Sequence, residues 1–236
     1  MKNLSHIFLV TICSILLGIS TLAQAQDKPG FLFVNATVTD FEKLGVYGRA
    51  LPPVYAKYDG IYRIFGGIGR GVEVLAGSAM HESVIFAEFK SLKDVETFWW
   101  SDEYRAVFPL REGAGIFDVV GLAGTGEQPY SAESGIQPAY MFTLVTVKNP
   151  EKTQAYMEAT SDFTANAPGR LIALARPADM SILEGPKPEH TIEITSWPSV
   201  QAIKSYLSDP EFTKVNALRE EAMDFTVMVA EVPKPR

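Results

Sequence analysis

The stretch EYRAVFPLREGAGIFDV at residues 103–119 recurs as EFTKVNALREEAMDFTV at residues 211–227, displaced by 108 positions. The match extends without a gap over residues 72–119 and 180–227. Self-similarity at a fixed displacement indicates two copies of one structural unit. We therefore predict that the second half of the chain repeats the fold of the first.

Upstream of this stretch the displacement is one position longer and pairs Tyr47 with Tyr156, so a single-residue change in length separates the two registers. Between the copies, residues 124–138 are rich in Gly, Ser, Pro and Glu, a composition typical of a linker. The expected organisation is a first repeat at residues 30–123 and a second at residues 139–232.

Each copy is predicted to run strand, helix, strand, strand, helix, strand. The first copy has predicted strands at 31–39, 61–76, 83–89 and 116–122 and helices at 42–57 and 91–113. The second has a strand at 140–147, a helix at 149–165, a strand within 171–183 bent at Pro177, a strand at 189–195, a broken helix from Ser199 and a strand at 225–231. Asn149 and Asp209 each precede a proline, which predicts a helix N-cap followed by a favourable first position.

A signal peptide is predicted at residues 1–25. Lys2 precedes an apolar run at residues 7–19, and the small-residue motif Ala23-Gln24-Ala25 follows it. The run is shorter than the about 20 apolar residues that span a membrane. We expect a periplasmic or secreted protein that is free of the membrane after cleavage.

Charge and cysteine content limit the partners of the mature chain. Removal of residues 1–25 takes away Cys13 and leaves 20 basic and 28 acidic residues, a net charge of −8. An acidic surface without Lys/Arg clusters is repelled by phosphate backbones and anionic lipid, so we expect no nucleic-acid or membrane partner. Without cysteine, the mature chain has no disulfide and no thiolate metal ligand.

The order of elements resembles a known family. The features that carry the resemblance are Leu183-Glu184-Gly185 at the end of the bent strand and the step Ser208-Asp209-Pro210-Glu211-Phe212 that leads to Arg219. They resemble the uncharacterised-domain family numbered 1330, of the dimeric α+β barrel, ferredoxin-like group. The resemblance covers both copies and implies an α+β fold of two tandem ferredoxin-like βαββαβ domains.

By this resemblance, two such domains place their open sheets face to face to form a barrel. The sheet faces could pair within one chain or between two chains. Related barrels include cofactor-free oxygenases, isomerases, haem enzymes and ligand-binding modules, so function has to be argued from a site.

Glu184 is the first catalytic candidate. On an alternating strand it shares a face with Met180 and Ile182, so its carboxylate is expected to point into an apolar cavity, where burial raises a carboxyl pKa. The first copy has Ala76 at the matching position. The alternative is a strand-end carboxylate in solvent or paired with an arginine.

His190 is the second catalytic candidate, because Glu189-His190 and His81-Glu82 precede matching strands and histidine titrates near neutral pH. A solvated polar turn is the alternative, and no third ligand stands at metal spacing, so neither a metal nor a cofactor is expected. Arg219 is a candidate anion anchor, with a surface ion pair as the alternative. Tyr156, Met180 and Ile182 complete the expected ligand-binding set.

Three functions remain open from the sequence. The favoured one is an exported small-molecule-binding or accessory protein. The second is a cofactor-independent oxygenase or isomerase that acts on a small, partly apolar substrate, with Glu184 or His190 as proton acceptor. The third is a purely structural dimerisation module.

Overall fold

The computed structural model describes residues 28–132 and 136–233, so the predicted signal peptide lies outside the described residues. The first copy contains β1 (Gly30–Val38), α1 (Phe41–Ala50), α2 (Pro52–Lys57), β2 (Ile61–Ile68), β3 (Gly71–Ala76), β4 (Ser83–Phe89), α3 (Leu92–Trp100), α4 (Asp102–Val107), the 3-10 helix η1 (Phe108–Arg111) and β5 (Gly115–Ala123). The second contains β6 (Ala139–Val147), α5 (Pro150–Ala165), β7 (Arg170–Ala175), β8 (Ser181–Glu184), β9 (Thr191–Trp197), α6 (Val200–Leu207), α7 (Pro210–Thr213), α8 (Asn216–Ala222) and β10 (Met223–Glu231). The predicted α+β fold with a repeated order of elements is confirmed.

The structure differs from the prediction in the second strand of each copy, which is two strands with different neighbours. In the first copy Gly69 and Gly71 have φ values of 74° and 90°, a backbone region that favours glycine, and they turn the chain between β2 and β3. β2 pairs with β4 of its own copy, whereas β3 pairs with β10 of the other copy. Likewise β7 pairs with β9, whereas β8 crosses over to pair with β5. Each copy therefore contributes one short strand, β3 or β8, that pairs with the other copy.

This exchange joins all strands into one ten-stranded sheet with the order β7-β9-β6-β10-β3-β2-β4-β1-β5-β8. The sheet curls until its two ends approach each other. Gly124, which follows β5, forms an isolated bridge with Ala173 of β7, and Thr125 N–H donates a hydrogen bond to Ile172 O at 2.8 Å. The two copies therefore pair within one chain.

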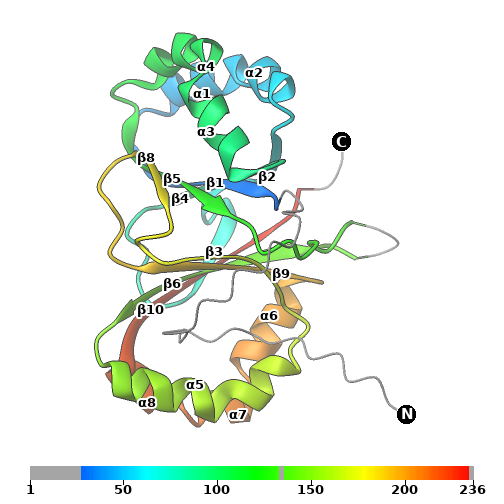
Figure 1. Cartoon of the computed structure of the whole chain (residues 1–236), viewed down its shortest axis with the longest axis vertical. Helices are drawn as coiled ribbons and strands as arrows, with labels where there is room; N and C mark the ends of the chain where they lie inside the picture. Colours follow the sequence, from blue (N-terminus) through cyan, green and yellow to red (C-terminus); the bar gives the residue numbers. More distant parts are fainter. Residues whose placement is uncertain (1–27, 133–135, 234–236) are drawn as a thin grey trace, which may run out of the picture.

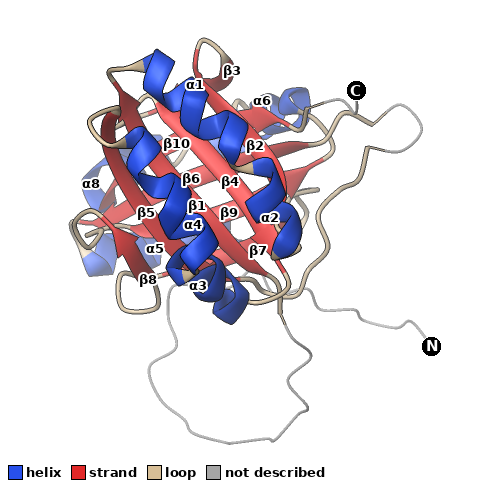
Figure 2. Ribbon diagram, turned by 90° about the horizontal axis from the view of Figure 1, so that it is seen from above, coloured by secondary structure: helices blue, strands red, loops and turns tan. Residues whose placement is uncertain are grey.

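The helices form two outer layers. Helices α1 to α4 cover one side of the barrel and α5 to α8 cover the opposite side (Figure 1). Seen from above, α1 to α4 lie across the strands of the first copy (Figure 2). None of the helices in the described residues is long and apolar enough to cross a membrane.

The central strands are apolar on both faces because each of them separates two cores. In β1, Phe31 and Phe33 belong to the barrel interior, whereas Leu32 and Val34 belong to the core under the first helix layer. A strand buried on both faces loses the alternation of apolar and polar residues and appears as a continuous apolar run. A polar side chain that points from the sheet into the core under a helix layer is therefore unexpected.

Local sequence sets the helix starts as predicted. Asn149 accepts a hydrogen bond from Lys152 N–H at 3.1 Å and Asp209 accepts one from Glu211 N–H at 2.8 Å, each just before a proline at the first helical position. The predicted N-caps of α5 and α7 are confirmed.

Candidate functional site

Each copy has a pocket between its helices and its sheet. The α5 pocket of the second copy has a volume of about 400 Å³, and its wall includes Thr143, Tyr156, Thr160, Glu193, Tyr206 and Phe212. The α1 pocket of the first copy has a volume of about 450 Å³, and its wall includes Phe41, Gly45, Tyr47, Gly48, Phe65 and Ile85. The repeat pairs Tyr47 with Tyr156, so the two pockets are equivalent positions of the repeated fold.

Glu193 distinguishes the α5 pocket. Its neighbours Ile192 and Ile194 are 1% and 0% exposed and face the barrel interior, so alternation along β9 turns Glu193 toward α5. Burial raises the pKa of Glu193, and within the described residues it is the one cause of that shift. The part of the side chain that remains accessible faces the pocket. Glu193 is therefore a half-buried carboxyl group on the wall of a mostly apolar pocket, with no cation of the described residues paired to it.

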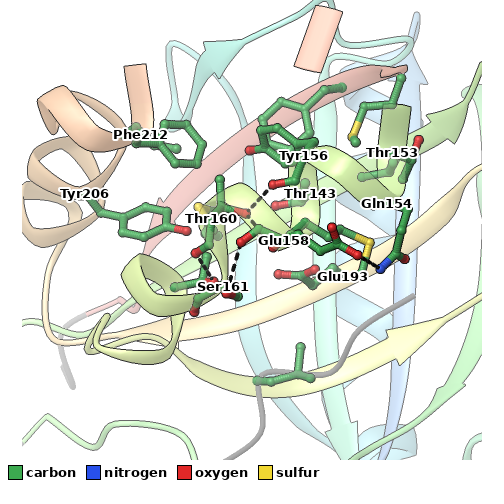
Figure 3. A pocket seen from close by; sticks show the side chains of 18 residues that line it. Thr143, Thr153, Gln154, Tyr156, Glu158, Thr160, Ser161, Glu193, Tyr206 and Phe212 are labelled. Atoms are coloured by element: carbon green, nitrogen blue, oxygen red, sulfur yellow. Dashed lines mark hydrogen bonds between the residues drawn. The ribbon is translucent and has the colours of Figure 1, made fainter. Parts of the chain in front are cut away.

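Thr143 adds a buried hydroxyl group to the same pocket. It lies opposite Glu193 in the register between β6 and β9. Its hydroxyl is buried and finds no hydrogen-bond partner among the described residues. Figure 3 shows Glu193, Thr143 and Tyr156 projecting into the same space. Buried polar groups in folded proteins are normally hydrogen-bonded, so this pair indicates room for a ligand or ordered water.

Two tyrosines contribute hydroxyl groups to the wall. Burial raises the pKa of Tyr156 to about 12, with Arg219 acting against the shift and Glu193 adding to it. Burial also raises the pKa of Tyr206, with Tyr156 and Glu193 adding to it. Both phenols stay protonated at neutral pH and can donate a hydrogen bond.

The raised pKa of Glu193 predicts a pH-dependent cost in stability. The native carboxyl holds its proton more tightly than the unfolded one, so stability falls as pH rises from the ordinary glutamate pKa of about 4.3 through the raised native value. Glu193→Gln has no such proton. We expect this variant to melt at a higher temperature than the wild type at pH 7, and the gain to disappear at or below pH 4.

Thermal melts at both pH values test this expectation. Glu158→Gln is the matched control, because Glu158 is an exposed glutamate on the rim of the same pocket that accepts a hydrogen bond from Gln154 at 2.7 Å. An equal gain of the Glu193 variant at both pH values would contradict a buried, charged Glu193.

The sequence matches the family described as a domain of unknown function, DUF1330, over residues 29–125 and again over residues 138–233. The chain belongs to the DUF1330 family. The two matched segments each contain one copy of the repeat, and no curated protein matches the chain.

Three solved structures align with most of the chain. A putative monooxygenase from Fusobacterium nucleatum has a TM-score of 0.50 and 9% identity, with 88% of this chain and 94% of that chain covered. A mutant chlorite dismutase from Candidatus Nitrospira defluvii has a TM-score of 0.50 and 9% identity, with coverages of 87% and 91%. An anthrone oxidase-like protein has a TM-score of 0.49 and 16% identity, with coverages of 90% and 94%. At these identities the likeness to the first two shows the α+β barrel fold alone.

The predicted orientation of Glu184 is wrong. Register shifts between Val119 and Val120 of β5, so Glu184 lies opposite Val119 and Ile182 lies opposite Val120, with Leu183 as the extra residue of a β-bulge. Glu184 is thereby turned away from the face that holds Met180 and Ile182, which pack in the barrel interior. It instead forms a two-pronged ion pair with Arg111 of the first copy, and one of its two hydrogen bonds measures 3.0 Å.

Arg219, the counterpart of Arg111, has a different environment. Its guanidinium lies 4.9 Å from the centre of the Phe225 ring. No carboxylate of the described residues lies within 4.0 Å of it. In the repeat Ala76 of the first copy matches Glu184 of the second, so Arg219 has an alanine where Arg111 has a carboxylate. Its charge counteracts the rise in the pKa of Tyr156, and it does not line the α5 pocket.

His190 lies in a third pocket of about 340 Å³ at the barrel interior, together with His81 and Asp118. His81 forms hydrogen bonds of 2.9 Å with Asp118 Oδ2 and with Thr37 Oγ1, so both of its ring nitrogens are occupied. Burial lowers the pKa of His190, against the opposing charge of Asp118. The structure thus brings the two histidines together but places His190 and Glu184 in different sites.

The site residues fit haem and metal ions poorly. Haem iron is commonly held by histidine, whereas the α5 pocket has no histidine in its lining and both histidines of the described residues line the third pocket. Within residues 28–132 and 136–233, no group of three or more His, Cys, Asp or Glu side chains is placed to hold a metal ion.

Glu193 is the functional candidate that the sequence analysis missed. A signal was present, because the gap-free register of the repeat places Glu193 opposite Ile85. A carboxylate at a position where the other copy has an apolar residue is the same signal that drew attention to Glu184 and Ala76. Of the expected ligand-binding residues, Tyr156 is the one that lines the α5 pocket.

Proposed function

We propose that this chain is an exported protein that binds a small, partly apolar molecule in the α5 pocket, where Glu193 accepts a hydrogen bond from the ligand. Export is proposed from the amino-terminal sequence alone. The observation that carries the binding proposal is Glu193 itself, a pocket-facing carboxyl group whose raised pKa has burial as its one cause.

The physical argument is one of cost. A carboxylate removed from water without a partner is expensive, and proteins normally pair or neutralise it. The matching residue Ile85 shows that the fold accepts an apolar side chain there. A ligand that donates a hydrogen bond to Glu193 and fills the space against Tyr156 and Phe212 would supply the missing partner.

The test begins with native mass spectrometry of protein purified from its own source, to detect a retained small molecule. In parallel, 2-naphthol serves as a probe, because it joins an apolar ring system to one hydroxyl donor. We expect calorimetry to show at least tenfold weaker binding of 2-naphthol to Glu193→Gln, since a hydrogen bond to a charged acceptor contributes about 1.5–3 kcal/mol. Glu158→Gln should bind as the wild type does. Equal affinity of all three proteins would exclude Glu193 as the ligand contact.

A second candidate function, a cofactor-independent oxygenase, is favoured by the same raised pKa. A carboxyl group with an elevated pKa can act as a general base closer to neutral pH. Glu193 would remove a proton from an acidic C–H group, dioxygen would add to the carbanion to give a hydroperoxide after protonation, and loss of water would leave a carbonyl group. Oxygen consumption with anthrone as substrate, lost in Glu193→Gln and kept in Glu158→Gln, would establish catalysis. Binding without consumption would leave the ligand-binding role.

A further inference from the structure

The α1 pocket of the first copy holds two glycines where helix geometry alone favours other residues. Gly45 and Gly48 lie inside α1 and line this pocket. Glycine within a helix is destabilising relative to alanine because it loses more backbone freedom on folding. A sequence that retains two of them in a ten-residue helix needs a local reason.

Close packing does not supply that reason. A Cβ atom added at Gly48 would have no heavy atom within 4 Å, and one added at Gly45 would meet only the flexible end of Arg49 at 3.4 Å. The matching residues in the second copy are Gln154 and Met157, which project into the α5 pocket. The two glycines therefore keep space open on the helical side of the α1 pocket.

Three polar groups of this pocket are already paired, whereas the buried Trp99 Nε1–H donor finds no partner among the described residues and Arg49 lies on the exposed rim. The hydroxyls of Tyr47 and Tyr104 form a hydrogen bond of 2.8 Å, and the guanidinium of Arg111 is engaged by Glu184. The position that carries Glu193 in the other pocket is Ile85 here. In the buried part of the wall a charged ligand would find no free counter-charge, because Arg111 is paired with Glu184 and Arg49 is exposed to solvent, and the ligand would lose its own hydration.

The outer part of the wall is aromatic and exposed. Phe41 and Phe65 are 53% and 63% exposed and both line the pocket. Tyr55, which is 5% exposed, stacks with Tyr62, which is 38% exposed, and their ring centres lie 4.1 Å apart. Exposed large apolar side chains that gather at a cavity mark a binding surface more often than scattered single ones do.

We infer that the α1 pocket is a second binding site, independent of Glu193, for a neutral ring-containing apolar molecule. The geometry makes the two pockets of one chain chemically different. The α5 pocket offers an acceptor to a donor-bearing ligand, whereas the α1 pocket offers open apolar volume kept by Gly45 and Gly48.

The probe for this site is 6-propionyl-2-(dimethylamino)naphthalene, a neutral molecule without a hydrogen-bond donor whose fluorescence shifts to shorter wavelength in apolar surroundings. The filling variant is Gly45→Leu/Gly48→Leu, and its matched control is Gly45→Ala/Gly48→Ala, which raises helix propensity without filling the pocket. We expect the leucine pair to weaken probe binding at least tenfold and the alanine pair to change it less than threefold. Both pairs should melt at or above the wild-type temperature.

Further variants keep the result decisive. Gly48→Leu alone replaces the leucine pair if that pair does not fold, because its Cβ meets nothing. Glu193→Gln should bind the probe as the wild type does, which separates this inference from the proposed function. The charged analogues 1-naphthoate and 1-naphthylmethylammonium should compete with the probe at least tenfold less well than naphthalene.

Three results would overturn the inference. The first is unchanged affinity in the folded leucine variants. The second is loss of the probe when Met157→Trp fills the α5 pocket. The third is a dimer in sedimentation experiments that Phe65→Ser dissociates, because the exposed rim would then be covered by a second copy of the chain.

Discussion

Replacement of Glu184 by leucine is expected to lower the free energy of unfolding by about 3–5 kcal/mol, the usual cost of leaving one charge of a buried ion pair without its partner. Arg111 is 5% exposed and its guanidinium lies 4.3 Å from the centre of the Phe117 ring and 4.4 Å from that of Phe108. Once Glu184 is gone, neither solvent nor another carboxylate within 4.0 Å in the described residues takes its place.

The reverse change is expected to cost less. In Arg111→Met the new side chain can fill the space among the same rings, and the remaining carboxylate of Glu184, 28% exposed, can be hydrated. The double variant Arg111→Met/Glu184→Leu should recover most of the loss, because replacing both partners of a buried pair by apolar residues is often neutral or stabilising.

Urea unfolding of the four proteins measures these differences. Glu189→Leu is the control, since Glu189 is an exposed residue in the loop before β9. If Glu184→Leu were no less stable than this control, the ion pair would contribute nothing to stability. The pair also joins the copies, because Arg111 belongs to the first and Glu184 to the second.

The orientation of the Glu184 side chain depends on information that the sequence lacks. Alternation of side chains predicts its face correctly only if β8 is regular, and the bulge at Leu183 reverses the result. The residues around Leu183 do not predict that bulge, because it arises from the pairing of β8 with β5, a strand of the other copy. The pairing partner is a long-range property of the fold, and so is the ion pair that depends on it.

Other features were predictable because they are local or repeated. The caps at Asn149 and Asp209 follow from side-chain chemistry within a few residues of each helix start. The repeat gives the order of the strands, and Glu193 could have been found from the same comparison. What the repeat could not reveal is the exchange of β3 and β8, since two closed four-stranded units and one continuous barrel share the same local sequence pattern.

The barrel interior is a core shared by the two copies, and Phe86 is one of its fully buried members. Phe86 is fully buried in β4 of the first copy. Its ring centre lies 5.1 Å from that of Tyr140 and 5.5 Å from that of Phe142, both on β6 of the second copy. Truncation of Phe86 therefore opens a cavity between the copies and not within one of them.

Phe86→Ala is expected to lower the free energy of unfolding by about 3–5 kcal/mol, as buried Phe→Ala substitutions generally do. The matched control Phe65→Ala removes the same atoms from a side chain that is 63% exposed and should cost about 0.5 kcal/mol or less. Because the truncated core belongs to both copies, the loss should appear equally in each.

Tryptophan fluorescence can follow the copies separately, since Trp99 is buried in the first copy and Trp197 in the second. With Trp100 and then one of the other two replaced by phenylalanine, each remaining tryptophan should report the same urea midpoint, and Phe86→Ala should shift both midpoints together. Two separate midpoints would mean that the copies unfold independently. The exchanged strands β3 and β8 would then contribute little to the stability of the closed barrel. A common midpoint follows from the structure, because the exchanged strands β3 and β8, the pair of Arg111 with Glu184 and the Phe86 cluster all cross from one copy to the other.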